Sequence, residues 1–384
     1  MSEDYSSNNV HALRADDPFD GTSFIARLHE RIRNTVRLGG QLRIEGKGTR
    51  SDAHCPTSGE PLSLRDWQGI VQYEPDDQVI TVRTGTPVVE VQRVLALQRQ
   101  MLGFEPPQQA GSTIGGAVAL GWSGPRRPFA GALRDHLLGV RMLDGLGRDL
   151  RFGGQVVKNV AGFDVARLMA GSLGLLGPLL EVSLRVIPCP AVEITTVLAL
   201  DAVDSLALMQ RLPTGPGLLS GAVHVDGCLY LRSAGSPECV EAFLRRHGGT
   251  LLEQQSSEAF WRGFAHQTHP FFVPLESDHG HPMRLWRVSV RPGSPVMDIA
   301  PATSIDWAGA VRWVWAPMSA YPALKQWATA HGGHVALWRH GTRQEQETVL
   351  QASMTPALRD IHRRIKQVFD PHGIFHPGRL FASC

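Results

Sequence analysis

Cysteine is scarce in this sequence: five occur among 384 residues, and no two of them form a CxxC pair. An odd, scattered set argues against the disulfide framework of a secreted protein and fits a reducing compartment. It also argues against an iron–sulfur cluster held by this chain alone, because such clusters take closely grouped thiolates. We therefore expect no metal centre in this chain.

Excess charge and long apolar runs are missing as well. The formal net charge is +2 at pH 7, too small to indicate binding to nucleic acid or to an anionic membrane surface. No run approaches the roughly 18 apolar residues of a membrane span. The first twenty residues are polar and acidic, unlike a signal peptide. We expect residues 1–20 to be disordered and the protein to be cytoplasmic.

What is present is a chain long enough for two domains. In residues 21–190, short β-rich segments alternate with helices and many glycines. Thr86 and Pro87 predict the start of a helix, with Thr86 as its cap. The apolar side chains of that helix (Val88, Val91 and Leu95) fall on one face. Alternating hydrophobicity predicts strands at Leu42–Ile44, Val79–Val82, Leu138–Leu143 and Leu179–Ile187.

Pro188 and Pro190 close this block and indicate a domain boundary. Residues 191–384 read as a mixed α/β region with fewer local patterns. Thr355 and Pro356 predict its last helix, whose apolar stripe comprises Leu358, Ile361, Ile365 and Val368.

A glycine-rich loop, Gly46–Ser51, follows the first predicted strand. Its glycines let backbone N–H groups converge on an anion, and its hydroxyls add donors. The spacing is close to GxGxxG, but Ser51 replaces the last glycine and no helix pattern follows. Taken alone, the loop is better interpreted as an ordinary turn.

A second glycine-rich stretch spans Gly111–Gly124 (GSTIGGAVALGWSG). Its glycines break helix propensity, yet it is too apolar for a solvated linker. Gly111, Gly115 and Gly116 leave room for a bulky ligand, while Ser112 and Thr113 provide hydroxyls. The alternative is a buried packing segment between sheets.

Two later segments carry turn and capping residues. In Lys158–Gly177, Asp164 is expected to cap a short helix over 165–170 that Gly171 ends. In Phe369–Arg379, Asp-Pro-x-Gly is turn chemistry. Taken alone, its His372 and His376 are interpreted as surface turn residues.

In this order, the four segments resemble the FAD-binding domain of the vanillyl-alcohol-oxidase, or p-cresol-methylhydroxylase (PCMH), type. The C-terminal DPHGIFHPGR resembles a motif of the FAD-linked oxidases. SGPRR at 123–127, KNVAGFDVARLMAGSLG and LLEVSLRVIP are similar to the FAD-binding E subunits of three-subunit bacterial glycolate oxidases. The resemblance implies an α+β fold, with a two-subdomain PCMH-type FAD-binding domain over residues 21–190. A smaller mixed α/β cap or interaction domain follows over 191–384 and ends in a flavin-proximal motif.

The resemblance also assigns the cofactor contacts. Gly46–Ser51 and Gly111–Gly116 would hold the FAD pyrophosphate, Ser123 and Gly124 would line the flavin or its ribityl chain, and Gly171–Gly177 would pass near the adenine. The chain departs from the family at His376, where asparagine is usual, and at Leu175 and Pro178. The implied cofactor-binding residues are Gly46, Lys47, Gly48, Thr49, Arg50, Ser51, Gly111, Ser112, Thr113, Gly115, Gly116, Ser123, Gly124, Gly171, Gly174, Gly177 and His376.

A catalytic base is not evident. Oxidation of a 2-hydroxy acid needs a base beside the flavin, and the larger FAD-linked oxidases carry HxGDGNxH and EHGIG motifs that are absent here. His224–Gly227 is only a fragment of the first motif, and the pair His331 and His334 lacks a carboxylate at metal spacing, so we interpret these histidines as loop residues. His266, His269, His279 and His281 occur among aromatic residues, where a solvated loop is favoured over a pocket.

The resemblance therefore predicts a glycolate or D-lactate dehydrogenase subunit that binds FAD and passes electrons on without binding glycolate itself. Its partners would be a catalytic FAD-linked oxidase subunit and an iron–sulfur subunit, through which any contact with the inner membrane would be peripheral. The alternatives are a stand-alone FAD-dependent oxidoreductase for another small 2-hydroxy acid or alcohol, and a glycine-rich protein without cofactor. Non-covalent binding of FAD is favoured over a covalent bond to the flavin, for which His54 is the only nearby candidate.

Overall fold

The computed structural model describes residues 21–49, 59–108, 111–154, 163–215, 217–274, 281–300 and 302–376. The predictions made for residues 1–20, Arg50, Ser51, His54 and His279 lie outside these ranges. Within them, the helices are all too short or too polar to cross a membrane.

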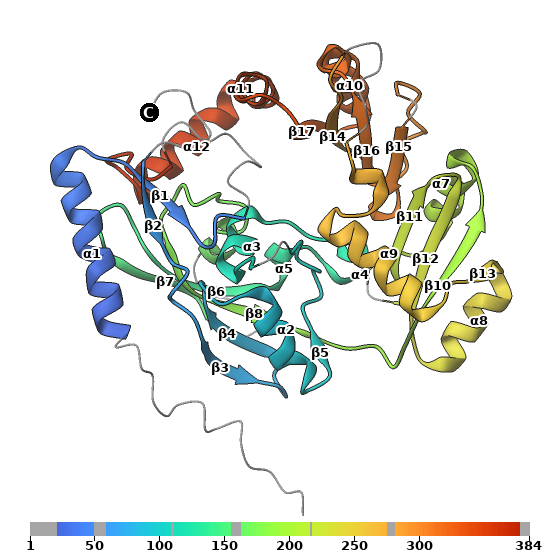
Figure 1. Cartoon of the computed structure of the whole chain (residues 1–384), viewed down its shortest axis with the longest axis horizontal. Coiled ribbons are helices and arrows are strands. Elements are labelled where there is room, and N and C mark those ends of the chain that lie inside the picture. Colours follow the sequence, from blue (N-terminus) through green and yellow to red (C-terminus); the bar gives the residue numbers. More distant parts are fainter. Residues whose placement is uncertain are drawn as a thin grey trace, which may run out of the picture.

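The first half of the chain is built on a five-stranded antiparallel sheet in the order β3-β4-β8-β6-β7 (Figure 1). Helix α1 packs into one apolar cluster with β1 and β2, and α2 into another with β4 and β8. Strands β1 and β2 form a separate parallel pair, and β5 pairs with β9. The elements are α1 (Gly21–Leu38), β1 (Leu42–Glu45), β2 (Glu60–Ser63), β3 (Ile70–Glu74), β4 (Val79–Arg83), α2 (Val88–Ala96), β5 (Gln100–Met101), α3 (Ile114–Leu120), α4 (Arg127–Ala130), α5 (Leu133–His136), β6 (Leu137–Leu143), β7 (Asp149–Gly153), α6 (Val165–Leu168), β8 (Leu179–Arg185) and β9 (Ile187–Pro188).

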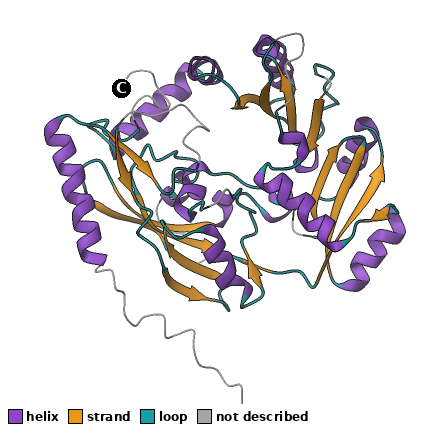
Figure 2. Cartoon of the chain, in the orientation of Figure 1, coloured by secondary structure: helices purple, strands orange, loops and turns teal. Residues whose placement is uncertain are grey.

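The second half holds an eight-stranded antiparallel sheet in the order β13-β10-β12-β11-β15-β16-β14-β17. Figure 2 shows the two sheets as separate bodies, each with its own helices. The elements are β10 (Val192–Ala199), α7 (Ala202–Arg211), β11 (Leu219–Val225), β12 (Cys228–Gly235), α8 (Pro237–His247), β13 (Thr250–Leu251), α9 (Gln254–His266), β14 (Arg284–Ser289), β15 (Ala302–Asp306), the 3-10 turn Trp307–Gly309, β16 (Val311–Ala316), α10 (Tyr321–Ala330), β17 (His334–Arg339), α11 (Arg343–Ser353) and α12 (Pro356–Phe369). The predicted α+β class is confirmed.

The last described segment returns to the first half. Helix α12 lies beside that half in Figure 1, and the residues after it run next to β1. The Leu42 N–H donates to the Ile374 carbonyl at 2.7 Å, and the His376 N–H donates to the Leu42 carbonyl at 2.9 Å. One wall of the first half is therefore formed by residues that come after the second sheet in the sequence.

The locally encoded elements agree with their predictions. The predicted strands at 42–44, 79–82 and 138–143 are present, and 179–187 splits into β8 and β9. Thr355 caps α12 by accepting from the Leu358 N–H, and Asp164 caps α6 by accepting from the Arg167 N–H, although α6 ends at Leu168 and not at Gly171.

Two local predictions are wrong. Thr86 does not cap α2, because its hydroxyl donates to the Arg83 carbonyl at 2.7 Å and Pro87 takes the cap position. The stretch predicted to be non-helical contains α3, which Thr113 caps and which ends at Gly121 in a left-handed conformation. The Thr113 cap starts this helix, and packing explains its glycine at 115, since a Cβ there would lie 2.6 Å from the Thr84 Cβ.

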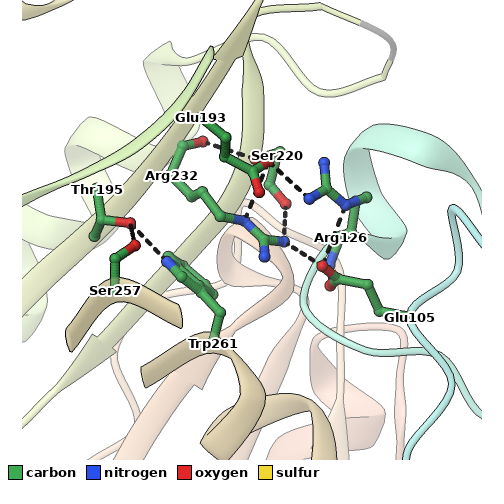
Figure 3. Close-up of polar contacts among 8 residues, drawn as sticks. All are labelled: Glu105, Arg126, Glu193, Thr195, Ser220, Arg232, Ser257 and Trp261. Atoms are coloured by element: carbon green, nitrogen blue, oxygen red, sulfur yellow. Dashed lines mark hydrogen bonds and ion pairs between the residues drawn. The ribbon is translucent and has the colours of Figure 1, made fainter. Parts of the chain in front are cut away.

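A buried network of charges joins the two halves (Figure 3). Arg126, which precedes α4, donates to Glu105 at 3.2 Å and to Glu193 of β10 at 2.7 Å. Arg232 of β12 reaches Glu105 at 2.7 Å and Glu193 at 3.8 Å. Both arginines are 5% exposed. Each half supplies one arginine and one glutamate, so the network fixes how the halves meet.

Candidate cofactor-binding site

A cavity of about 400 Å³ lies where β1, α3 and the returning segment come together. Eleven of the residues singled out in the sequence line it, from all four segments. They are Gly46, Lys47, Gly48, Thr49, Ser112, Thr113, Gly115, Gly116, Gly174, Gly177 and His376. The fold thus brings together segments more than 300 positions apart in the sequence.

The two glycine-rich loops touch directly. The Thr49 and Ser112 hydroxyls lie 3.4 Å apart, and a Cβ on Gly46 would overlap the Thr113 hydroxyl. The same hydroxyl accepts from the Gly116 N–H at 3.2 Å, which fixes the start of α3. Gly111 does not line the cavity but packs against the Lys47 side chain. Bare backbone, hydroxyls and one ammonium therefore face a common space, which is the donor set that a phosphate needs.

His376 closes the opposite wall. It is 3% exposed, with a φ of +43°, and its Nε2 accepts from the Ile44 N–H at 3.0 Å. A Cβ on Gly174 would lie 2.7 Å from this Nε2, so glycine is needed there. The interpretation of His376 as a surface residue is wrong, whereas His372 is exposed as predicted.

An ion pair holds this wall in place. Asp370, 2% exposed, accepts from the Ile374 and Phe375 N–H groups at 3.1 and 2.9 Å. Lys366 donates to Asp370 and to the Leu175 carbonyl. Turn chemistry indicated Asp370, but no sequence pattern pointed to Lys366. Leu175 and Pro178, where the chain departs from the family pattern, do not line the cavity.

A second cavity, of about 380 Å³, shares Pro107, Leu120 and Trp122 with the first. Ser123, Gly124 and Gly171 line it, so Gly171 lies apart from Gly174 and Gly177. Arg127 lines it from the first half as well, and the wall from the second half includes Arg287, Trp307, Trp313 and Trp338. Sequence reasoning missed this wall, because no motif marks it.

Asp306 lies in the second cavity with an unusual carboxyl group. It is 4% exposed, and it accepts from the Trp307 N–H at 2.6 Å and from the Trp313 Nε1–H at 3.3 Å. Burial raises the pKa of Asp306 to about 6, against the lowering effect of these hydrogen bonds. The folded protein therefore favours the protonated acid more than the unfolded chain does.

We expect Asp306 to destabilise the fold as its proton is lost. Relative to Asp306→Asn, the free energy of unfolding of the natural protein should fall between about pH 4 and pH 6, because the folded state binds the extra proton in that window. The shift corresponds to roughly 3 kcal/mol at most. Urea unfolding of both proteins at pH 4, 5, 6 and 7 measures their free energies of unfolding. A difference between the two proteins that does not change with pH would contradict the prediction.

The histidine interpretations need correction. His224 is a buried residue of β11, not a loop residue, and its Nε2 contacts the Leu200 carbonyl. His266 and His269 lie at and just after the end of α9, where His269 packs on Phe260 and Phe264. The neighbouring aromatics form a buried core, whereas His281 is exposed, as the interpretation of a solvated loop has it. Across the described ranges, no group of three or more His, Cys, Asp or Glu side chains is placed to hold a metal ion.

Two family models match the chain. An FAD binding domain matches residues 25–153, and the C-terminal domain of FAD linked oxidases matches residues 317–380. The two matches cover the glycine-rich loops and the returning segment, and they identify the cofactor as FAD.

Relatives agree with these matches. Glycolate oxidase subunit GlcE of Escherichia coli K12 is 35% identical over 93% of this chain and 97% of its own length. Glycolate oxidase subunit GlcD of Bacillus subtilis is 30% identical over 42% of this chain, but the match spans only 35% of that protein. The fold is similar to a solved alkyldihydroxyacetonephosphate synthase, with a TM-score of 0.64 and 14% identity over 92% of this chain and 74% of that one. The chain therefore belongs to the GlcE family of glycolate oxidase subunits, within the FAD-linked oxidases that have a PCMH-type FAD-binding fold.

Proposed function

We propose that this chain is the FAD-binding subunit of a glycolate oxidase assembly, which oxidises glycolate to glyoxylate and passes the electrons on. The observation that carries the proposal is the first cavity, where four separate segments present bare backbone and hydroxyls to one space. The near full-length similarity to GlcE supports the assembly.

We infer a division of roles within the site. The loop that begins at Gly46, together with Ser112 and Thr113, would hold the pyrophosphate, because these residues supply the backbone approach and the donors. Ser123 and Gly124 would contact the flavin end of the cofactor, since they lie in the adjoining cavity. When bound, FAD supplies the two-electron redox chemistry. Binding would be non-covalent, and residues 21–190 and 191–384 would be the two domains.

His376→Ala should weaken FAD binding about tenfold, equivalent to about 1.4 kcal/mol. The Ile44 N–H beside the cavity loses its acceptor, and an unpaired buried donor costs about 1–3 kcal/mol. Titration of the apoprotein with FAD, followed by flavin fluorescence, measures the dissociation constant. His372→Ala, exposed in the same turn, is the matched control. Equal affinities for His376→Ala and the natural protein would show that this wall does not support binding.

Partners would supply what this chain does not. A GlcD-like flavoprotein subunit would carry a catalytic base, and an iron–sulfur subunit would take up electrons. The scattered cysteines and the absence of a metal-binding group in the described residues support this division. The assembly would be cytoplasmic, with contact to the inner membrane only through partners.

The alternative is a stand-alone FAD-dependent oxidoreductase for another small 2-hydroxy acid or alcohol. The full chain is purified alone and together with a GlcD-type and an iron–sulfur subunit, and its visible spectrum is recorded with FAD. We expect flavin absorbance near 450 nm (about that wavelength from general flavin chemistry) in both samples, and bleaching by glycolate at a catalytic rate only in the assembly. Fast bleaching of the isolated chain would favour the alternative. A colourless preparation after addition of FAD would overturn FAD binding itself.

A further inference from the structure

Two guanidinium groups face the second cavity from opposite halves of the molecule. Arg127 belongs to α4 in the first half, and Arg287 belongs to β14 in the second. Both stack on the Trp307 ring, at 4.2 and 4.5 Å from its centroid. Arg287 also lies over Trp338, 5.4 Å away. Aromatic rings thus position both cations but do not neutralise them.

The buried arginines of the described chain all have close acceptors, whereas Arg127 and Arg287 are half-buried. Arg126 and Arg232 pair with two glutamates, and Arg284 pairs with Glu345 at 2.9 Å. Arg312 donates to backbone carbonyls, among them Ser294 at 3.1 Å. Buried charges are normally paired in this way.

Arg127 and Arg287 differ, because among the described residues neither guanidinium has a hydrogen-bonded acceptor, and the carboxylates that act on them, Asp135 and Asp306, do so only through space. Burial, followed by repulsion from Arg127, lowers the pKa of the Arg287 guanidinium to about 10. Burial, and then repulsion from Arg134, lower the pKa of the Arg127 guanidinium. Two like charges therefore share one cavity.

Asp306 offsets only part of this charge, because its carboxylate attracts Arg287 through space and forms no hydrogen bond with either arginine. Its oxygens accept from the Trp307 N–H and the Trp313 Nε1–H, and burial raises the pKa of this carboxyl to about 6. The cavity's other titratable groups, Arg134 and His334, lie at the surface. Among the described residues, Arg127 and Arg287 therefore face one carboxylate, and a bound anion would offset the excess positive charge.

We propose that the second cavity binds a small carboxylate between Arg127 and Arg287. The planar fork of arginine matches the two oxygens of a carboxylate. The ligand is small, because about 380 Å³ is near the lower end of the range for small-molecule sites and four tryptophans wall it. The choice of a carboxylate over other anions rests on the proposed function. This proposal also differs from the sequence-based prediction that the chain binds no hydroxy acid. That prediction was based on the missing catalytic motifs and did not consider these two arginines.

The test uses oxalate, a two-carbon carboxylate without an oxidisable C–H bond, titrated into the FAD-loaded full chain. Calorimetry gives its affinity, and the flavin absorbance band reports a ligand nearby. We expect saturable binding that weakens at least tenfold in Arg287→Gln and in Arg127→Gln. Arg287→Lys should keep part of the affinity, because it retains the charge without the fork. Arg291→Gln removes the same charge from an exposed position outside the cavity and should bind oxalate normally.

The outcomes separate this inference from the proposed function. Retained FAD binding in Arg287→Gln shows that the variant is folded, so lost oxalate binding then supports the site. Oxalate binding that is equal in the natural protein and both glutamine variants overturns it, as does no binding to the FAD-loaded chain. Tighter binding of inorganic phosphate than of oxalate or acetate overturns the carboxylate class. Failure to bind FAD would instead contradict the proposed function, and oxalate binding to the apoprotein would still test the arginines.

Discussion

Replacing Arg126 with methionine should lower the free energy of unfolding by about 3–5 kcal/mol, the usual cost of removing one partner from a buried ion pair. Glu105 and Glu193 would be left with Arg232 as the only cation of the network. Burial alone would lower the pKa of Arg126, but these two carboxylates outweigh it and raise the pKa. The guanidinium is therefore held charged in the folded state, and both carboxylates depend on it. Chemical denaturation of the full chain with FAD in excess measures the loss.

The loss of stability depends on how deeply the ion pair is buried. The control is therefore an arginine–glutamate pair at the surface. Arg245 and Glu241 lie 2.9 Å apart on α8, with both side chains 67% exposed. Arg245→Met should cost less than about 0.5 kcal/mol. Adding Glu105→Gln to Arg126→Met should restore part of the stability, because one uncompensated charge is removed. Equal losses for Arg126→Met and Arg245→Met would mean that the network does not hold the halves together.

Gly46→Val should reduce FAD affinity at least a hundredfold, equivalent to about 2.7 kcal/mol. The new Cβ would overlap the Thr113 hydroxyl, and the two methyl groups would extend into the first cavity. Thr113 cannot yield cheaply, because its hydroxyl accepts from the Gly116 N–H at the start of α3. The dissociation constant is measured by titration of the apoprotein with FAD.

The control for this variant is another glycine in a loop. A Cβ on Gly293 would meet nothing within 4 Å, and Gly293 lines neither cavity. Gly293→Val should bind FAD as the natural protein does. Circular dichroism of both apoproteins separates lost binding from lost folding. Normal FAD affinity in a folded Gly46→Val protein would show that the loop at Gly46 does not approach the cofactor.

Features that depend on a few neighbouring residues could be predicted from the sequence. The cap at Thr355, the cap at Asp164 and the buried face of α2 each follow from side chains within one or two turns of the backbone. The glycine-rich segments were recognisable for the same reason. Their order along the chain pointed to one cofactor site before any spatial contact was known.

Features set by distant contacts could not be predicted in this way. Gly115 occurs inside helix α3 because Thr84, about 30 positions earlier in the sequence, leaves no room for a side chain there. The second cavity needs Arg127 and Arg287 to meet on Trp307, and neither β14 nor the Trp307 turn has a pattern that sets it apart from an ordinary core. The same holds for the aromatic residues around α9, whose burial depends on β16 and β17.

The contact between Ile44 and His376 also has a consequence for the timing of biosynthesis, since 332 positions separate the two residues. At roughly 5–20 residues per second, a ribosome needs on the order of 20–60 s to travel from one to the other. During that interval the nascent chain exposes its glycine-rich loops while one wall of the pocket has not yet been made. We therefore expect the cofactor to be captured only after this last segment emerges, so that FAD loading and completion of the fold are one event.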